Sequence, residues 1–331
     1  MAQKATIKDI AKAVGVTPAT VSNVLNGTKR FSDETKKRIL QAAEELNYTP
    51  NISARALVKN RTYNLGLFIP ASPSAFLDPY FSELLRGLTE VALERGYVVS
   101  IIYSDGLDES VRARIDGLVL TEVKLKDPYI KYFHQLNVPF VVLANGDENG
   151  VEDYVVSDTR KGMEEAISYL VRLGHRRLGY ALGPISYEYV YERYTLFKEI
   201  FGETHLDAPA AHVATGSNSR DGGRDAARRI MRSKDKPTAI LASTDIMALG
   251  VIEYLKSAGY RVPEDVSVIG FDDSSFSKYV NPTITTIRHD IYQLGRHAAM
   301  MLISKLDGRE YERPVTLPVK FIARESISAP K

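Results

Sequence analysis

Near the amino terminus, Thr6–Gly27 reads TIKDIAKAVGVTPATVSNVLNG, which contains two short helical patterns joined by a tight turn. Thr6 with Asp9 three residues later has the form of a capping box. Thr17 followed by Pro18 is a typical start for a second helix, because proline at the first helical position loses no hydrogen bond. Two short helices joined in this way are typical of the helix-turn-helix, which places its second helix in the DNA major groove.

The second predicted helix separates apolar side chains from small and polar ones. At about 100° per residue, its inner face holds Val21, Val24 and Leu25. Its outer face has no large apolar residue and consists of Ala19, Ser22, Asn23 and Asn26. A third helix is expected after Ser32, with an apolar stripe that comprises Ile39, Leu40, Ala43 and Leu46. Such helices could form a purely structural bundle, but the small outward residues favour DNA binding.

Basic charge is concentrated in the same part of the chain. Residues 1–61 hold eleven Lys and Arg against five Asp and Glu, a net charge of +6, whereas the whole chain of 331 residues has a net charge of +2. A basic segment attached to a mildly acidic remainder suits the binding of phosphate groups. Charge alone is weak evidence, because a Lys-rich exposed helix is often only a solvated surface.

The segment 49–61 is interpreted as a hinge. Pro50 can open a short helix, but a helix of under about 12 residues is marginal in water unless it docks on something. Leu57 lies in this basic segment and could act as a wedge between base pairs of the minor groove. Alternatively, the segment is a plain linker and Leu57 packs on the rest of the chain.

Beyond residue 61, apolar β-rich runs alternate with helical patterns, which predicts parallel sheets. The number of strands favours two lobes. The expected strands are Asn64–Pro70, Tyr97–Tyr103, Ile115–Thr121, Val138–Leu143, Tyr154–Ser157, Arg177–Leu182, Ala210–Thr215, Thr238–Ala242, Val266–Phe271 and Thr283–Arg288. Ligands of such sheets bind at the carboxyl ends of the strands, so we expect a cleft between the lobes.

Polar and aromatic side chains follow several of these strands. Tyr80 and Phe81 come after the first, Thr244 and Asp245 after the eighth, and Asp272 after the ninth. Carboxylates accept hydrogen bonds from paired sugar hydroxyls, and aromatic rings cover the apolar face of a sugar. A polyhydroxylated ligand is therefore expected in the cleft, although Asp245 could instead only cap the helix that follows it.

Other classes of protein find little support. The chain has no cysteine, which excludes disulfides and thiolate sites, and its six histidines show no metal-binding spacing. We find no nucleophile elbow and no phosphate-binding loop. No apolar run reaches membrane-spanning length, and no signal-peptide pattern is present. We expect a cytoplasmic protein that is not an enzyme, needs no cofactor or metal and has no membrane partner.

These residues, together with motifs farther along the chain, resemble the LacI/GalR family of bacterial transcription regulators. The motifs are Val21–Gly27, Pro50–Asn51, Ala54–Leu57, Ile115–Val119, Leu173–Arg176, Asp245–Gly250, Val262–Asp273 and Pro282–Thr286. They run essentially from end to end, and as a set they are highly specific. The resemblance implies an all-α helix-turn-helix head plus an α/β two-lobed periplasmic-binding-protein-like body with parallel sheets.

The resemblance also implies how the chain is divided. The helix-turn-helix head would comprise residues 1–48, the hinge helix or linker 49–61, and the effector-binding and dimerisation body 62–331. Within the body, the N-lobe would comprise about 62–157 plus 289–318, and the C-lobe about 158–288 plus 319–331. The segment Ser104–Arg114 is shorter than usual for the family and leaves room for at most two helical turns.

Individual positions match contact residues of the family. Those matching DNA contacts are Thr6, Thr17, Pro18, Ala19, Thr20, Ser22, Asn23, Asn26, Ser32, Tyr48, Asn51, Ala54 and Leu57. Those matching effector contacts are Tyr80, Phe81, Tyr189, Arg193, Asn218, Thr244, Asp272 and His289. Phe76 is added because it lies in a loop that is longer than usual and could reach over the ligand.

A protein of this kind would be a homodimer that binds double-stranded operator DNA, with an affinity controlled by a small molecule in the cleft. We expect a repressor whose inducer is a mono- or oligosaccharide, and a purine corepressor is the alternative. A transport solute-binding protein would share the two-lobed body but lack the basic head. An enzyme on an α/β scaffold would need a catalytic constellation, and the sequence shows none.

Overall fold

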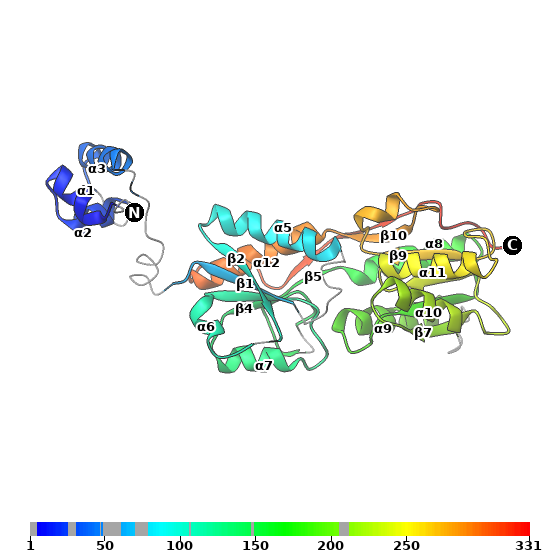
Figure 1. Cartoon of the computed structure of the whole chain (residues 1–331). Helices are drawn as coiled ribbons and strands as arrows, with labels where there is room; N and C mark the ends of the chain where they lie inside the picture. Colours follow the sequence, from blue (N-terminus) through cyan, green and yellow to red (C-terminus); the bar gives the residue numbers. More distant parts are fainter. Residues whose placement is uncertain are drawn as a thin grey trace. The chain divides into compact units, whose positions relative to one another are not determined.

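The computed structural model describes residues 5–25, 31–46, 48, 61–69, 79–105, 107–146, 149–204 and 212–331. The chain forms two compact units, Met1–Thr62 and Tyr63–Lys331 (Figure 1). Five residues of the sequence-based site lie outside the described residues, namely Asn26, Asn51, Ala54, Leu57 and Phe76. No helix within the described ranges is long and apolar enough to cross a membrane.

The described part of the first unit contains three helices, α1 (Ile7–Val14), α2 (Pro18–Leu25) and α3 (Asp33–Glu45). The predicted caps of α1 and α2 are confirmed. The backbone N–H of Thr6 donates to Asp9 Oδ2 at 2.8 Å. The Thr17 hydroxyl accepts the backbone N–H of Thr20 at 3.1 Å. Gly15 ends α1 with a φ of 73°, a left-handed conformation that glycine adopts without strain.

The core of the first unit corrects one detail of the sequence analysis. Its buried residues are Ile10, Ala11, Val14, Val21, Ile39, Ala42 and Ala43. Leu40 and Leu46 were expected on the apolar stripe of α3, but they are 55% and 38% exposed. The inward face of α3 follows the spacing i, i+3, i+4 from Ile39, so Ala42 takes the place that was assigned to Leu40.

The second unit contains a four-stranded parallel sheet in the order β2-β1-β3-β4. Its strands are β1 (Asn64–Ile69), β2 (Val98–Tyr103), β3 (Gly117–Leu120) and β4 (Phe140–Val142). The surrounding helices are α5 (Pro79–Glu94), α6 (Val111–Arg114), α7 (Pro128–Gln135) and α12 (Ile291–Leu306). Helices α5 and α12 pack on one face of the sheet and share an apolar core with β1, while α6 and α7 pack on the other face (Figure 1). We call this part the N-lobe. The segment Ser104–Arg114 contains the short helix α6, as expected from its length.

A six-stranded sheet in the order β12-β10-β9-β8-β6-β7 forms the centre of the C-lobe. Its strands are β6 (Leu178–Leu182), β7 (Val213–Thr215), β8 (Ala239–Ala242), β9 (Ser267–Phe271), β10 (Thr285–His289) and β12 (Val319–Ile322). Its helices are α8 (Thr159–Arg172), α9 (Glu188–Thr204), α10 (Arg220–Ile230), α11 (Asp245–Ser257) and the 3₁₀ helix η4 (Ser275–Lys278). Strand β12, which the sequence did not predict, runs antiparallel to β10 at the edge of this otherwise parallel sheet.

The chain crosses between the lobes three times within the described residues. Two crossings run side by side, because β5 (Val155–Ser157) pairs in parallel with β11 (Val315–Leu317). The third runs from β10 into α12 at Asp290, whose side chain caps that helix. Each lobe is therefore assembled from stretches of chain that are far apart in the sequence.

Helices α5 and α12 approach so closely that neither can carry a side chain at the contact. A Cβ atom at Gly87 would lie 2.0 Å from the carbonyl oxygen of Tyr292, and one at Gly295 would lie 2.3 Å from that of Leu84. We expect Gly87→Ala to push the helices apart and to lower the free energy of unfolding by about 2 kcal/mol.

Urea denaturation measures this loss, and Gly202→Ala in α9 is the matched control. A Cβ atom at Gly202 meets nothing within 4 Å, so this substitution should be neutral or slightly stabilising. Equal stability of Gly87→Ala and the unsubstituted chain would contradict the close contact.

Candidate functional site

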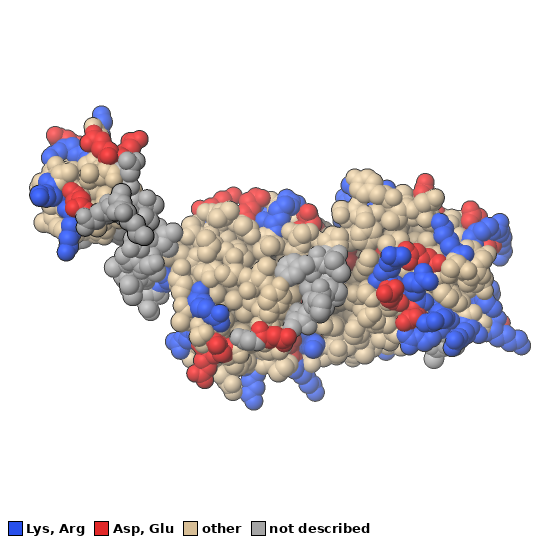
Figure 2. Space-filling model, viewed as in Figure 1, with Lys and Arg blue, Asp and Glu red and all other residues tan. Residues whose placement is uncertain are grey.

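The beginning of α2 presents small and polar side chains at the surface of the first unit. Thr17, Pro18 and Ala19 are exposed, and the hydroxyls of Thr17 and Thr20 lie 2.9 Å apart. The predicted DNA contacts that are at least partly exposed are Thr6, Thr17, Pro18, Ala19, Thr20, Ser22, Asn23, Ser32 and Tyr48. Figure 2 shows basic and acidic side chains on this unit. A surface of short side chains beside a tight turn is the geometry that a helix needs to approach base edges.

A cavity of about 740 Å³, counted to its open mouth, lies between the N-lobe and the C-lobe. The predicted effector residues that line it are Tyr80, Phe81, Tyr189, Arg193, Asn218, Thr244, Asp272 and His289. The tertiary structure thus brings together, from elements of both lobes, every predicted effector residue that it describes.

Arg193, in α9, forms the polar end of the cavity. Its guanidinium carbon lies 3.4 Å from the centre of the Phe271 ring and 5.1 Å from that of Tyr189. One nitrogen donates to the carbonyl oxygen of Ser243, and another lies 3.9 Å from Asp272 Oδ1. Arg193 is only 5% exposed, and within the described part of the chain its Nε has no hydrogen-bond partner. This N–H group is thus buried without a partner, although the side chain of Arg193 lines the cavity.

His289 joins Asp272 to the crossing segments. Its Nε2 lies 3.1 Å from Asp272 Oδ1, and its Nδ1 lies 3.2 Å from the hydroxyl of Ser157. The ring of Tyr80, from the N-lobe, stacks on His289 with centres 6.1 Å apart and planes inclined by 23°. Asp272 is thereby held where a ligand that touches both lobes can reach it.

A second chain of hydrogen bonds lines the C-lobe side of the cavity. The Thr244 hydroxyl donates to Asn218 Oδ1 at 2.8 Å, and Asn218 Nδ2 donates to the Tyr189 hydroxyl at 3.2 Å. Burial, reinforced by the charge of Glu122, raises the pKa of Tyr189 well above its ordinary value. Tyr189 therefore keeps its proton at neutral pH and can donate it to a ligand oxygen.

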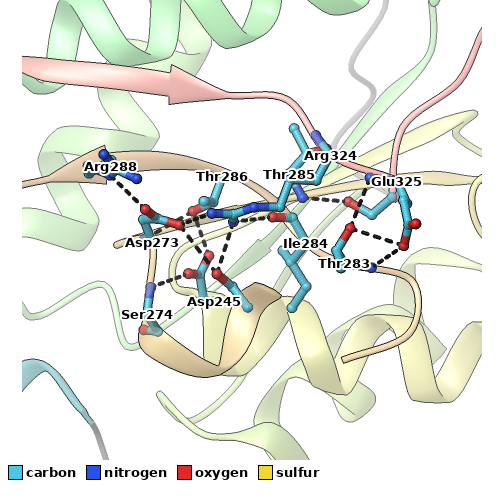
Figure 3. A network of polar contacts seen from close by, with 12 residues as sticks. Asp245, Asp273, Ser274, Thr283, Ile284, Thr285, Thr286, Arg288, Arg324 and Glu325 are labelled. Atoms are coloured by element: carbon cyan, nitrogen blue, oxygen red, sulfur yellow. Dashed lines mark hydrogen bonds and ion pairs between the residues drawn. The ribbon is translucent and has the colours of Figure 1, made fainter. Parts of the chain in front are cut away.

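A polar network behind the cavity holds the loop that carries Asp272 (Figure 3). Asp272 and Asp273 have φ values of 113° and 55°, in a region that costs energy for residues other than glycine. The carboxylate of Asp245 accepts the backbone N–H of Ser274 at 2.7 Å and the hydroxyl of Thr286 at 2.6 Å. These two bonds fix the loop from inside the lobe.

Two arginines hold the same loop from its outer side. Arg324 lies 2.5 Å from Asp273 Oδ1, and Arg288 donates to Asp273 Oδ2 at 2.6 Å. Arg324 also donates to the hydroxyl of Ser277 at 2.9 Å and to the carbonyl oxygen of Ile284 at 2.8 Å. The unusual backbone of the loop is therefore stabilised by contacts with η4, β10 and the segment after β12.

Both expectations for Asp245 are wrong. The residue was expected either to face the cleft or to cap α11, but it is fully buried and does not line the cavity. Thr244 caps α11 instead, by accepting the backbone N–H of Met247 at 3.5 Å. Burial and the nearby Asp272 raise the pKa of Asp245, and the hydrogen bonds from Thr286 and Ser274 oppose this shift.

Several residues of the cavity wall were not predicted from the sequence. They are Glu122, Leu143, Ala144, Val155, Val156, Ser157, Thr159, Glu188, Glu192 and Leu294. Two of them had a signal in the sequence, because Glu188 and Glu192 directly precede Tyr189 and Arg193. Residues four apart share one face of a helix, so Glu188 and Glu192 form a row beside that of Tyr189 and Arg193, and both rows line the cavity.

Two family models match the chain. The model described as bacterial regulatory proteins, lacI family, matches residues 6–51, and a periplasmic binding protein-like domain matches residues 167–327. The HTH-type transcriptional repressor PurR of Mannheimia succiniciproducens is 31% identical over 335 residues, which cover 98% of this chain and 98% of that protein.

Solved structures agree with these matches. The transcriptional regulator CelR in complex with cellobiose is 28% identical, with a TM-score of 0.73 over 97% of this chain and 99% of that one. The lac repressor dimer bound to operator and the anti-inducer ONPF has a TM-score of 0.84 over 99% of this chain and 100% of that one. Because it is 24% identical, the second similarity supports the fold alone.

Asp245 is expected to be more important for stability than its distance from the cavity suggests. Asp245→Ala would leave the N–H of Ser274 and the hydroxyl of Thr286 buried without an acceptor, which should lower the free energy of unfolding by about 3 kcal/mol. Asp245→Asn keeps one acceptor oxygen, for the N–H of Ser274, and its amide can donate to the Thr286 hydroxyl, so it should cost less than Asp245→Ala, about 1 kcal/mol.

Thermal or urea unfolding of the two variants tests this difference. The control is Asp225→Ala, which removes an exposed carboxylate paired with Arg228 and should change stability by less than about 0.5 kcal/mol. Equal losses for Asp245→Ala and Asp245→Asn would show that the hydrogen-bonding role is wrong.

Proposed function

Because the chain belongs to the lacI family of bacterial regulatory proteins, we propose that it is a transcriptional repressor whose affinity for operator DNA is controlled by a sugar in the cavity between its lobes. The family membership rests on the matching model and on a relative of 31% identity that covers almost the whole chain. The relatives are transcriptional repressors, so the chain is a regulator and not an enzyme.

The observation that supports a sugar is the mixture of rings and hydrogen-bonding groups in one cavity wall. Tyr80 and Phe81 offer apolar ring surfaces from the N-lobe, while Asn218 and Asp272 offer polar atoms from the C-lobe. The apolar face of a sugar can pack on the rings, and its hydroxyls can bond to the polar atoms. The relative CelR, whose solved structure is a complex with cellobiose, also supports a carbohydrate effector.

We also propose a separate role for each part of the chain. Residues 1–48 would read the operator, residues 49–61 would form the hinge with Leu57 as the minor-groove wedge, and residues 62–331 would bind the effector and form the homodimer. The proposed DNA contacts are Thr6, Thr17, Pro18, Ala19, Thr20, Ser22, Asn23, Asn26, Ser32, Tyr48, Asn51, Ala54 and Leu57. The sugar would act as an inducer, by favouring an arrangement of the two lobes in which the paired hinges no longer fit the operator.

An effector can shift such an equilibrium only through its different affinity for the two arrangements. The cavity meets this requirement, because its wall is built from both lobes. His289 ends β10 at one crossing between the lobes, and Ser157 ends β5 at another. A ligand that bonds to Asp272 and packs on Tyr80 would therefore change the angle at these crossings.

A gel-shift titration on the promoter region of the protein's own gene tests DNA binding. The full chain should retard this fragment, and a truncation that begins at Thr62 should not, because the truncated chain lacks the basic head. Added carbohydrates should then weaken the retarded complex. If no carbohydrate changes the affinity and a nucleobase does, the sugar is wrong and a purine effector takes its place.

Arg193→Ala should raise the sugar concentration needed for release at least tenfold, because a charged hydrogen bond to the ligand is lost. Arg172→Ala, which removes an exposed guanidinium at the end of α8, is the control and should leave the concentration unchanged. If both variants needed the same sugar concentration for release, Arg193 would not be a ligand contact.

A further inference from the structure

The cavity wall carries more acidic than basic groups. The acidic side chains among its described residues are Glu122, Glu188, Glu192 and Asp272. The basic side chains among them are Arg193 and His289. A wall of this composition favours some ligand charges over others. This preference is additional to the preference for a sugar.

The positive charge of Arg193 already faces a carboxylate. Asp272 Oδ1 lies 3.9 Å from the guanidinium and 3.1 Å from His289 Nε2, and all three side chains are at least nine-tenths buried. An anionic ligand group that approached Arg193 would have to compete with Asp272 at close range. The positive charge of Arg193 is thus already paired with Asp272, and the three glutamates lie in the same wall.

The glutamates differ in their surroundings. Glu188 is 3% exposed and accepts the backbone N–H of Asn145 at 3.3 Å. Burial raises the pKa of Glu192, although a hydrogen bond with Thr159 and the charges of Arg193 and Arg160 oppose this shift.

The polar atoms of the wall suit hydroxyl groups. Asn218 and Thr244 line the cavity together with the rings of Tyr80, Phe81 and Tyr189. A neutral hydroxyl can bond to such groups without adding negative charge beside Asp272 and the glutamates.

We propose that the cavity selects its sugar by charge, accepting neutral or amine-bearing sugars and rejecting those that carry a carboxylate or a phosphate. This inference rests on the proposed function, since it assumes a sugar in the cavity. Like charges repel strongly at cavity distances even at an effective dielectric constant of about 20, and salt screens buried charges poorly. An ammonium group would instead be attracted to Glu188 and Glu122.

Matched sets of ligands test the proposal on the full chain. Each set contains a hexose, its 2-amino-2-deoxy form, its uronic acid and its 6-phosphate, in the gluco, galacto and manno series, with cellobiose as a neutral disaccharide. Thermal shift finds the binding series, and calorimetry measures the dissociation constants. In that series the uronic acid and the phosphate should bind at least tenfold more weakly than the neutral sugar, and the amino sugar at least as tightly.

The outcomes separate the two claims. A uronic acid or phosphate that binds as tightly as its neutral parent overturns the charge selection and leaves the sugar effector in place. If no sugar of any set binds, both the sugar effector and the charge selection are wrong.

Glu188→Gln tests whether the carboxylate of Glu188 causes the discrimination against acidic sugars. The amide keeps the shape and still offers an oxygen to Asn145, but it removes one negative charge, so the ratio of acid to neutral dissociation constants should fall at least threefold. The control is Glu83→Gln on α5, whose carboxylate is 47% exposed and paired with Arg86. This ratio should not change in the control.

A merely structural role for Glu188 would weaken the binding of neutral and acidic sugars alike and leave the ratio as it was, which would overturn the assignment. If Glu188→Gln does not fold, as judged by its melting temperature without ligand, Glu122→Gln gives the same test at the other glutamate.

Discussion

The buried carboxylate of Asp245 is the contact on which the geometry of the cavity depends. It binds the N–H of Ser274 and the hydroxyl of Thr286, and so fixes a loop whose backbone would otherwise avoid its conformation. The contact also constrains β9, because a Cβ atom at Gly270 would lie 2.1 Å from Asp245 Oδ1. With the loop fixed, Asp272 points at the guanidinium of Arg193. A residue outside the cavity thus determines what the cavity can bind.

The same geometry connects the cavity to the junction of the lobes. His289 bonds to Asp272 within the cavity and ends β10, directly before the crossing into α12. Ser157 bonds to His289 and ends β5, directly before the crossing into α8. Helix α12 in turn packs tightly on α5 at Gly87. The contacts of the cavity and of the lobe junction therefore involve the same residues.

The cavity also shows how one fold hosts different specificities. Arg193 and Asp272, which were predicted from the family resemblance, line the same cavity as Glu122, Glu188 and Glu192. Glu188 and Glu192 lie on α9 in the row next to that of Tyr189 and Arg193. Under the proposals above, the family pattern predicts where an effector binds, and the glutamates select its charge.

The helices of the first unit could be predicted from local capping at Thr6 and Thr17, as could the alternation of strands and helices that follows. The principal cavity residues could be predicted as well, because family motifs identify positions along the chain. In contrast, the support that Asp245 gives to the loop and the antiparallel pairing of β12 with β10 became evident only in the folded lobe. Local interactions are encoded within a few residues of each other and can be predicted from a pattern. Burial and strand pairing depend on residues far apart in the sequence, whose meeting is settled only when the whole lobe packs.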